Sequence, residues 1–209
     1  MNSFKTLIFD IGNVIIDIDY NVTIAEFQKL AVTDFSQIVS YTQQNRIFDL
    51  YETGKISSAD FINGLKQFLK PGITNEEIVR AWNSILIHYP PQKIALLKKL
   101  KKKYRVIALS NINEIHVNAI DEAARKKLSA TKFADFFHHA YYSNEIQLRK
   151  PNKEIYDFVV AEQNLKPQET FFVDDKLENI EAAKECGIQA YQLQDRNKLT
   201  ELLTSVGIL

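Results

Sequence analysis

One stretch near the start of the chain constrains the fold more than any other: residues 7–17 read Leu-Ile-Phe-Asp-Ile-Gly-Asn-Val-Ile-Ile-Asp. An apolar, strand-like run at residues 6–9 ends on Asp10, and the turn residues Gly12 and Asn13 precede a second apolar run. Apolar runs of this length, bounded by turn residues, are typical of a strand buried on both faces. A carboxylate at the carboxyl end of such a strand lies where open α/β sheets bind ligands. Asp10 is therefore the first candidate for a functional residue.

Strand and helix patterns alternate from residue 90 to the end of the 209-residue chain. Alternation of this kind predicts a parallel sheet flanked by helices. Residues 17–89 differ, because four helical patterns follow one another there with no strand between them. We therefore predict an α/β fold in which residues 1–16 and 90–209 form a Rossmann-like parallel sheet core and residues 17–89 a four-helix insertion. The strands are expected at residues 104–109, 140–142, 170–173 and 189–193, and the inserted helices at 21–31, 34–48, 57–70 and 74–86.

The insertion carries two further signals. Its last helix begins at a capping box, in which Thr74 is followed three residues later by Glu77. This helix is expected to continue through Leu86 on its buried face. Glu52 and Lys55 stand in a loop that could meet a substrate, although an exposed surface pair is favoured. The histidines lack metal-ligand spacing and are expected to be structural or exposed: His88, His116, His138 and His139.

The charge balance excludes several classes of partner. Twenty-six basic residues match 26 acidic ones, which gives no net electrostatic attraction toward nucleic acid or an anionic membrane. Cys186 is the single cysteine, which excludes an internal disulfide and suits a reducing compartment. There is no long uncharged apolar run, and the first residues lack the pattern of a signal peptide. We expect a cytoplasmic protein that binds neither nucleic acid nor membrane, and the sequence leaves protein partners open.

Polar residues stand where three of the predicted strands end, and a lysine precedes a predicted helix whose first turn follows a proline. Because the carboxyl ends of parallel strands meet at one edge of a sheet, these side chains are expected to converge. Carboxylates packed closely repel one another unless a cation neutralises them. An all-oxygen site with few protein ligands suits Mg²⁺, which keeps several waters and prefers substrate phosphates. The residues concerned are Asp10, Ser110, Asn111, Lys150, Asp174 and Asp175.

Such a site would have the parts needed for phosphoryl transfer. Ser110, the backbone of Asn111 and Lys150 could bind phosphate oxygens and compensate the charge on the transferring group. Asp10 would be free to attack phosphorus, as carboxylates do in aspartyl-phosphate enzymes. The expected partner is therefore a small phosphorylated molecule.

The ordered set of motifs resembles the haloacid dehalogenase-like superfamily, whose members are mostly Mg²⁺-dependent phosphotransferases. That family carries Asp-x-Asp after an apolar strand, Ser or Thr at a second strand end, a lysine often followed by proline, and acidic residues at a further strand end. The resemblance covers essentially the whole chain, and residues 17–89 look like the helical (C1-type) cap that one branch inserts after the first motif. The four motifs stand here as Asp10-Ile-Gly-Asn, Ser110-Asn111, Lys150-Pro151 and Asp174-Asp175.

Carried over residue by residue, the resemblance implies a role for each motif position. Asp10 would be the nucleophile and a metal ligand, and the backbone carbonyl of Gly12 would be another ligand of Mg²⁺. Asp175 would bind the metal directly, whereas Asp174 would bind through water or orient a neighbour. Lys150 would steady both Asp10 and the phosphoryl group. The resemblance assigns phosphate binding to Ser110, Asn111 and Lys150.

The chain departs from the family pattern at Gly12, which stands where the second aspartate of Asp-x-Asp usually acts as the general acid/base. A glycine cannot protonate a leaving oxygen or activate water, and such assistance is typically worth about 10²–10⁴-fold. Turnover should therefore be slow or restricted to leaving groups that need little protonation, such as a glycosyl phosphate. The variant motifs also resemble a bacterial branch that includes an α-glucose-1-phosphate phosphatase, so a sugar phosphate is the expected substrate.

Three alternatives stay open. A metal-independent 2-haloacid dehalogenase would also lack the second aspartate, but that branch generally lacks paired acidic residues such as Asp174 and Asp175. A phospho-ligand-binding protein with little turnover is supported by Gly12, although every other motif is retained. A phosphomutase is disfavoured, since returning the phosphoryl group to substrate also needs the missing acid/base.

Overall fold

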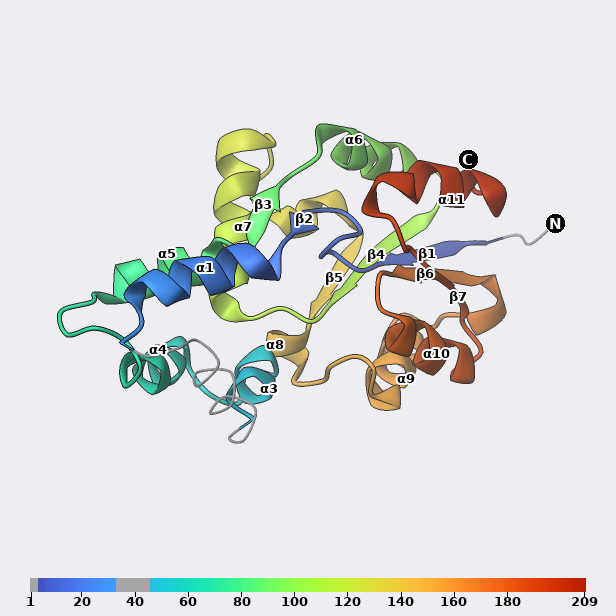
Figure 1. Ribbon diagram of the computed structural model, residues 1–209. Coiled ribbons are helices and arrows are strands. Elements are labelled where there is room, and N and C mark those ends of the chain that lie inside the picture. Colours follow the sequence, from blue (N-terminus) through green and yellow to red (C-terminus); the bar gives the residue numbers. More distant parts are fainter. Residues whose placement is uncertain (1–3, 33–45) are drawn as a thin grey trace.

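The computed structural model describes residues 4–32 and 46–209, and its centre is a five-stranded parallel sheet with the strand order β5-β4-β1-β6-β7 (Figure 1). The first strand of the chain lies in the middle of this sheet and pairs in parallel with β4 and β6. The parallel, doubly covered sheet confirms the predicted α/β class. The strands are β1 (Thr6–Phe9), β4 (Arg105–Ser110), β5 (His139–Tyr142), β6 (Thr170–Asp174) and β7 (Gln189–Gln192).

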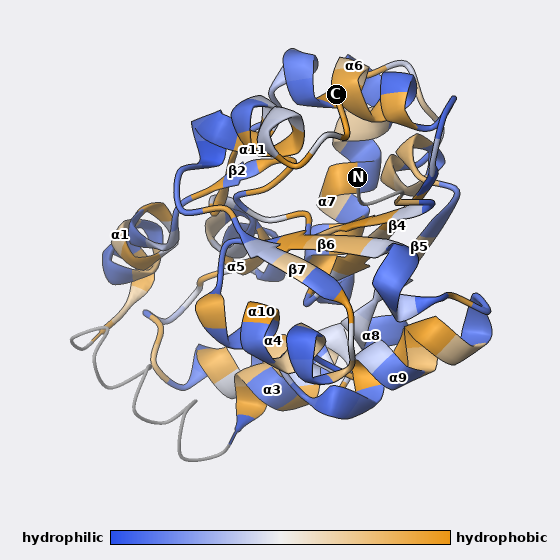
Figure 2. Cartoon of the chain, turned by 90° about the vertical axis from the view of Figure 1, so that its right-hand side faces the viewer, coloured by the Kyte–Doolittle hydropathy of each residue, from blue (hydrophilic) through white to orange (hydrophobic). Residues whose placement is uncertain are grey.

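Helices cover both faces of the sheet, and Figure 2 shows the sheet as a middle layer with α6 and α11 above it and α9 and α10 below. Leu7 and Phe9 of β1 face one apolar cluster, whereas Ile8 between them faces the other. This strand is therefore buried on both faces, as its uninterrupted apolar run predicts. The core helices are α6 (Pro91–Leu100), α7 (Glu114–Lys127), α8 (Ser143–Ile146), α9 (Lys153–Glu162), α10 (Leu177–Glu185) and α11 (Leu199–Ser205), with short 3₁₀ turns at Phe133–Phe136, Pro167–Glu169 and Arg196–Lys198.

The inserted segment forms a separate helical layer beyond the carboxyl ends of the strands (Figure 1). Phe27, Phe61 and Ile78 are buried in a third apolar cluster, which also includes Ile115 of α7. The expected capping box of Thr74 and Glu77 is present and starts α5. Most of the helix expected at residues 34–48 lies outside the described residues. The described helices are α1 (Tyr20–Leu30), α3 (Ile47–Glu52), α4 (Ser58–Lys66) and α5 (Asn75–Asn83).

The prediction that no strand interrupts residues 17–89 is wrong at both ends of the insertion. β2 (Asp17–Ile18) and β3 (Leu86–His88) form an antiparallel ribbon in which Asp17 pairs with His88 and Ile18 with Leu86. The expected last helix ends early, because the hydroxyl of Ser84 donates to the Ala81 carbonyl at 2.7 Å and so competes with the backbone pattern. Leu86 consequently lies on a strand. The apolar run Ile85-Leu86-Ile87 fits a helix and a strand equally well, so the sequence could not separate the two.

The ribbon is anchored to the core by a charged pair. Nζ of Lys93, on α6, lies 3.1 Å from Oδ1 of Asp17, and both side chains are largely buried. The amide of Asp19 also donates to the Ile85 carbonyl at 3.0 Å. The two chain crossings between core and insertion therefore lie side by side.

Within the described ranges, no helix is long and apolar enough to cross a membrane.

Candidate active site

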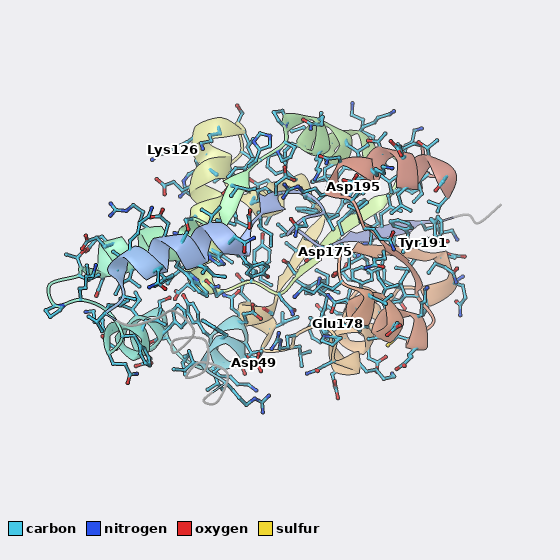
Figure 3. The ribbon with its side chains drawn as sticks, in the orientation of Figure 1. Asp49, Lys126, Asp175, Glu178, Tyr191 and Asp195 are labelled. Atoms are coloured by element: carbon cyan, nitrogen blue, oxygen red, sulfur yellow. The ribbon has the colours of Figure 1, made fainter. Side chains whose placement is uncertain are left out.

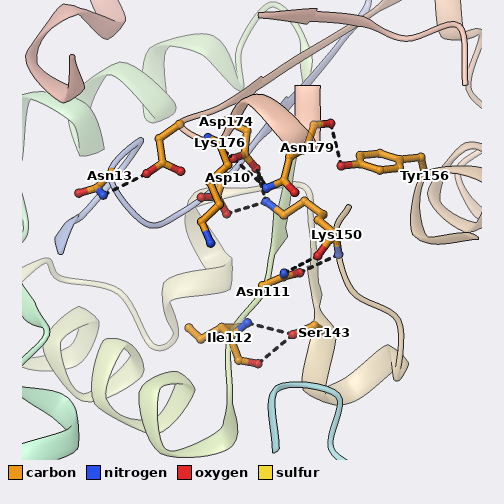
Figure 4. A network of polar contacts seen from close by, with 11 residues as sticks. Asp10, Asn13, Asn111, Ile112, Ser143, Lys150, Tyr156, Asp174, Lys176 and Asn179 are labelled. Atoms are coloured by element: carbon orange, nitrogen blue, oxygen red, sulfur yellow. Dashed lines mark hydrogen bonds and ion pairs between the residues drawn. The ribbon is translucent and has the colours of Figure 1, made fainter. Parts of the chain in front are cut away.

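A buried lysine lies between two carboxylates at the carboxyl edge of the sheet (Figure 4). Nζ of Lys150 is 2.8 Å from Oδ1 of Asp10, which follows β1, and 2.5 Å from Oδ2 of Asp174, the last residue of β6. Lys150 is 2% exposed, and Asp174 is completely buried. The sheet topology therefore brings these three predicted residues together, although 140 residues separate Asp10 from Lys150.

Asn111 holds Lys150 in place through a reciprocal pair of hydrogen bonds. Its Oδ1 accepts from the Lys150 amide at 2.9 Å, and its Nδ2 donates to the Lys150 carbonyl at 2.8 Å. The side chain of Asn111 is thus occupied in joining the loop after β4 to the loop before α9. Ser110 lies beside it at the end of β4 with its side chain buried.

Asp174 is held by a network of donors that leaves its carboxylate saturated. Nδ2 of Asn179, in the first turn of α10, lies 2.9 Å from each oxygen, and the Lys176 amide donates to Oδ1 at 2.9 Å. Tyr156 donates through its hydroxyl to the Asn179 carbonyl at 2.9 Å. Burial alone would raise the pKa of Asp174, but Lys150 and these hydrogen bonds together hold it below its usual value.

Asp10 and Asp175 have fewer hydrogen-bond donors around their carboxylates than Asp174 has. Burial raises the pKa of Asp10 to about 6 against the opposing attraction of Lys150, with Asp174 adding to the increase. Burial likewise raises the pKa of Asp175, whose Oδ2 accepts from Nδ2 of Asn13 at 3.1 Å. Figure 3 shows Asp175 at the boundary between the inserted helices and the core.

The three carboxylates are arranged as a possible cation site. One oxygen from each of Asp10, Asp174 and Asp175 lies within 4.8 Å of the others. Burial is the main cause of the raised pKa values of Asp10 and Asp175, and repulsion from Asp174 adds to both, so a bound cation would favour the charged carboxylates. An oxygen-only donor set of this kind fits Mg²⁺.

A small polar cavity of about 60 Å³ lies over these residues. Gly12 lines it, and a Cβ built on Gly12 would lie 4.0 Å from Oδ2 of Asp10 and 3.0 Å from Cδ1 of Ile18. A side chain at this position would therefore lie near the Asp10 carboxylate and would require the end of the Ile18 side chain to move. The remaining lining includes residues that the motifs did not indicate, namely Ile18, Tyr20, Glu52, Lys176 and Asn179.

A second cavity of about 110 Å³ continues from the first beneath the inserted helices. Its walls are mainly apolar, and Trp82 stacks on His116 at its far end with ring centroids 5.2 Å apart. Burial lowers the pKa of His116 to about 4, so the ring is neutral near pH 7. His116 lies in the wall of this cavity, and its structural role stays a prediction. The apolar walls are formed by Ile11, Ile16, Ile18, Trp82, Ile85, Leu86 and Ile112.

Glu52 is the clearest correction among the site residues, because the surface pair favoured for it is not what the structure shows. Its side chain lines both cavities, and its Oε2 lies 3.2 Å from Nη2 of Arg149. Lys55, by contrast, is exposed. No local pattern could have indicated the role of Glu52, because its position depends on how α3 packs against the core.

Comparison with known proteins agrees with this geometry. A model of the haloacid dehalogenase-like hydrolase family matches residues 4–187, and the chain therefore belongs to this family of hydrolases. It is 31% identical over 207 residues to D-ribitol-5-phosphate phosphatase of Bacteroides thetaiotaomicron, covering 96% of this chain and 99% of that protein. It is also 27% identical over 196 residues to sesquiterpene phosphatase astK of Aspergillus oryzae, covering 92% and 91%. The chain is thus a homologue of phosphatases.

Solved structures show the same fold. The HAD family enzyme BT-2542 of Bacteroides thetaiotaomicron, in complex with magnesium and inorganic phosphate, gives a TM-score of 0.82 at 35% identity and covers 90% of this chain and 93% of its own. A HAD-like family hydrolase of Porphyromonas gingivalis gives 0.87 at 25% identity, with 98% of each chain covered. A dehalogenase at 18% identity gives 0.66 over 98% of each chain, which shows the fold alone. The predicted family is confirmed.

Proposed function

We propose that this hydrolase is a Mg²⁺-dependent phosphatase that acts on a small phosphorylated metabolite of the sugar or polyol class. The observation that carries the proposal is the buried cluster in which Lys150 lies between Asp10 and Asp174, with Asp175 beside them. The phosphatase homologue of 31% identity and the magnesium and phosphate complex of a structural neighbour support it. The cytoplasmic location and the exclusion of nucleic acid stay predictions from sequence.

Asp10 is the proposed nucleophile. One carboxylate oxygen is held by Lys150, which leaves the other to attack phosphorus and form an aspartyl-phosphate. Lys150 would neutralise charge on the transferring group at the same time. Ser110 would contact a phosphate oxygen through its hydroxyl, and Asn111 through its backbone, since its amide side chain positions Lys150.

The residues for a metal ion are Asp10, Asp175 and the backbone carbonyl of Gly12. Bound Mg²⁺ would neutralise the clustered carboxylates and the phosphate. Asp174 is assigned the orienting role, because Asn179, Lys150 and the Lys176 amide already occupy its oxygens.

Residues 17–89 are the proposed cap domain, and residues 1–16 and 90–209 the proposed catalytic core. The cap contributes part of the wall of both cavities, so it would exclude water and select the leaving group. Both cavities are small, which supports a substrate with a short organic part.

The primary test is magnesium-dependent release of phosphate from a panel of sugar, polyol and glycosyl phosphates. We expect Asp10→Asn to abolish release, while Asp195→Asn, an exposed cap of a short 3₁₀ turn, retains it. Equal release by Asp10→Asn and the unaltered protein would refute the nucleophile.

Two outcomes would replace the proposal. Chloride release from 2-haloacids that chelator does not affect would indicate a dehalogenase. Ligand-induced thermal stabilisation without turnover on any phosphate ester would indicate a binding protein, for which the specific supporting observation is Gly12.

A further inference from the structure

The two cavities are neighbours that share six lining residues. Both are lined by Gly12, Ser110 and Asn111 on the core side and by Ile18, Tyr20 and Glu52 on the other. Because Gly12 carries no acid, any proton for the leaving oxygen must come from another residue. Among the described residues that line both cavities, only Glu52 and Tyr20 carry a titratable proton.

The end of α3 that carries Glu52 is fixed to the core by several contacts. The buried hydroxyl of Ser143 donates to the Glu52 carbonyl at 2.6 Å. It also accepts from the Ile112 amide at 2.9 Å, as Figure 4 shows. Tyr51 accepts through its hydroxyl from the Ile115 amide at 3.2 Å. Glu52 is therefore held against the segment that immediately follows Ser110 and Asn111.

The turn after Glu52 also packs tightly on the core. Gly54 has a φ of +62°, and a Cβ built there would overlap the Asn144 carbonyl oxygen. Only glycine therefore fits this position. A side chain on so well fixed a backbone is preorganised for a chemical role.

The charges around Glu52 favour a carboxyl group that can hold a proton. Burial raises its pKa above the ordinary value and outweighs the lowering by Arg149, Lys176 and Lys150. Asp49, on the preceding turn of α3, adds to the increase. Within the described residues the side chain has one partner, Arg149 at Oε2, which leaves Oε1 available.

Tyr20 is the weaker candidate. Burial raises the pKa of its hydroxyl above 10, and the negative charges of Glu52, Asp10 and Asp175 add to this against the opposing Lys176. A phenol of this kind is a poor proton donor near neutral pH.

We propose that Glu52, supplied by the cap, is the general acid/base of this enzyme and takes over the function that Gly12 cannot perform. The proposal rests on the phosphatase activity proposed above. It names a catalytic residue on the cap, outside the core motifs.

The proton and electron pairs balance over two steps. When Asp10 attacks phosphorus, the bond from phosphorus to the leaving oxygen breaks, and the proton of Glu52 passes to that oxygen to give an alcohol. A water then attacks the aspartyl-phosphate and gives its proton to the Glu52 carboxylate. The bond from phosphorus to Asp10 breaks, the electron pair returns to the Asp10 carboxylate, and phosphate leaves with Glu52 protonated again.

A purely structural role is the competing explanation, because Arg149 joins the core to the cap through both Glu52 and Asp49. Asp49→Asn provides a matched control. It removes a partner of the same arginine from the same helix, but Asp49 lines neither cavity. If Glu52 serves only to bind Arg149, Glu52→Gln and Asp49→Asn should have similar effects. A general acid/base is lost only in Glu52→Gln.

The experiment compares kcat/KM of Glu52→Gln and Asp49→Asn on p-nitrophenyl phosphate, whose leaving group needs no protonation, and on the best primary-alkyl phosphate of the panel. We expect Glu52→Gln to lose about 10²–10⁴-fold on the alkyl ester but to stay within about threefold on the nitrophenyl ester. The unaltered enzyme should lose alkyl-ester activity as pH rises through the pKa of Glu52, and this limb should be absent in Glu52→Gln. Asp49→Asn should preserve the ratio of the two substrates at low pH and should retain the pH limb, which moves to lower pH because Asp49 no longer raises the pKa of Glu52.

Rescue provides an independent measurement. Adding Gly12→Asp to Glu52→Gln should restore alkyl-ester hydrolysis at least tenfold, because the Cβ of the new residue would lie 4.0 Å from Oδ2 of Asp10 and so bring a carboxyl group to the site once the end of Ile18 moves. Equal losses on both esters, equal effects of Asp49→Asn, or a selective loss in Tyr20→Phe instead would overturn the proposal. Absence of magnesium-dependent phosphate release in the unaltered enzyme would instead refute the phosphatase itself.

Discussion

The hydroxyl of Ser143 lies 2.6 Å from the carbonyl oxygen of Glu52, and this hydrogen bond joins the core to the inserted helices inside the protein. Ser143 is completely buried. The hydroxyl oxygen of Ser143 also accepts from the Ile112 amide, so one side chain connects the inserted segment with the loop that follows β4. Removal of the Ser143 hydroxyl should therefore lower both stability and catalytic rate.

We expect Ser143→Ala to lower the free energy of unfolding by about 1–3 kcal/mol, because it leaves the Glu52 carbonyl and the Ile112 amide without their partner. It should also lower kcat on alkyl phosphates, since Glu52 loses its anchor. Urea unfolding and steady-state kinetics measure the two effects. Ser57→Ala, which removes an exposed helix cap, should affect stability alone. Unchanged kcat in Ser143→Ala would show that this bond does not position Glu52.

Lys150→Met should destabilise the metal-free protein by about 3–5 kcal/mol, because it leaves Asp10 and Asp174 buried without their shared cation. It should also abolish phosphatase activity. Added Mg²⁺ should stabilise this variant more than the unaltered protein, since the ion would replace the lost charge. Unfolding in chelator and in magnesium measures both. The exposed pair of Lys153 and Asp157 supplies the control, and Lys153→Met should leave unfolding unchanged.

Asp175→Asn should lose the increase in melting temperature that Mg²⁺ produces in the unaltered protein. The amide cannot offer the negative oxygen that the ion prefers, while the bond from Asn13 can still form. Differential scanning fluorimetry across a magnesium titration makes the measurement, and Asp195→Asn should shift like the unaltered protein. A full shift in Asp175→Asn would remove Asp175 from the metal ligands.

His116 should make stability depend on pH. Its Nε2 donates to the Trp82 carbonyl and its Nδ1 accepts from the Asn113 amide, so a second proton would meet another donor. The folded pKa of about 4 lies below the ordinary 6.5, and the unfolded state therefore binds more protons between these values. Stability is then fully present above pH 6.5 and falls by about 3 kcal/mol as pH falls through 4.

The pH effect is measured by urea unfolding at about pH 7 and about pH 4.5. His116→Gln can keep the donor to the Trp82 carbonyl but does not titrate, so its loss of stability between the two conditions should be smaller. An identical loss in both proteins would assign the dependence to other groups.

The sequence was sufficient to predict the core of the site because topology determines it. Asp10, Ser110 and Asp174 end parallel strands of one sheet, and such ends meet at one edge whatever the loops do. Glu52 could not be predicted in the same way. Its position depends on Ser143 and Gly54 meeting the core, which are contacts between segments far apart in the chain.

The same distinction explains the error in the inserted segment. The capping box at Thr74 is local, and its helix begins where expected. The end of that helix is decided by Ser84, which bonds both the preceding turn and Thr23 on α1. Leu86 then pairs with Ile18, which lies too far away in the chain for a local sequence pattern to indicate it.

The antiparallel ribbon of Asp17–Ile18 and Leu86–His88 makes the insertion exchangeable as one unit. Because Asp17 and His88 are direct neighbours, a short turn between them could replace the whole intervening segment without opening the sheet. A transplanted segment from a relative would bring its own pocket walls and its own proton donor, while the proposed nucleophile and the proposed metal ligands stayed in the core. In this family member, a new substrate and a new acid could thus be acquired in a single recombination event.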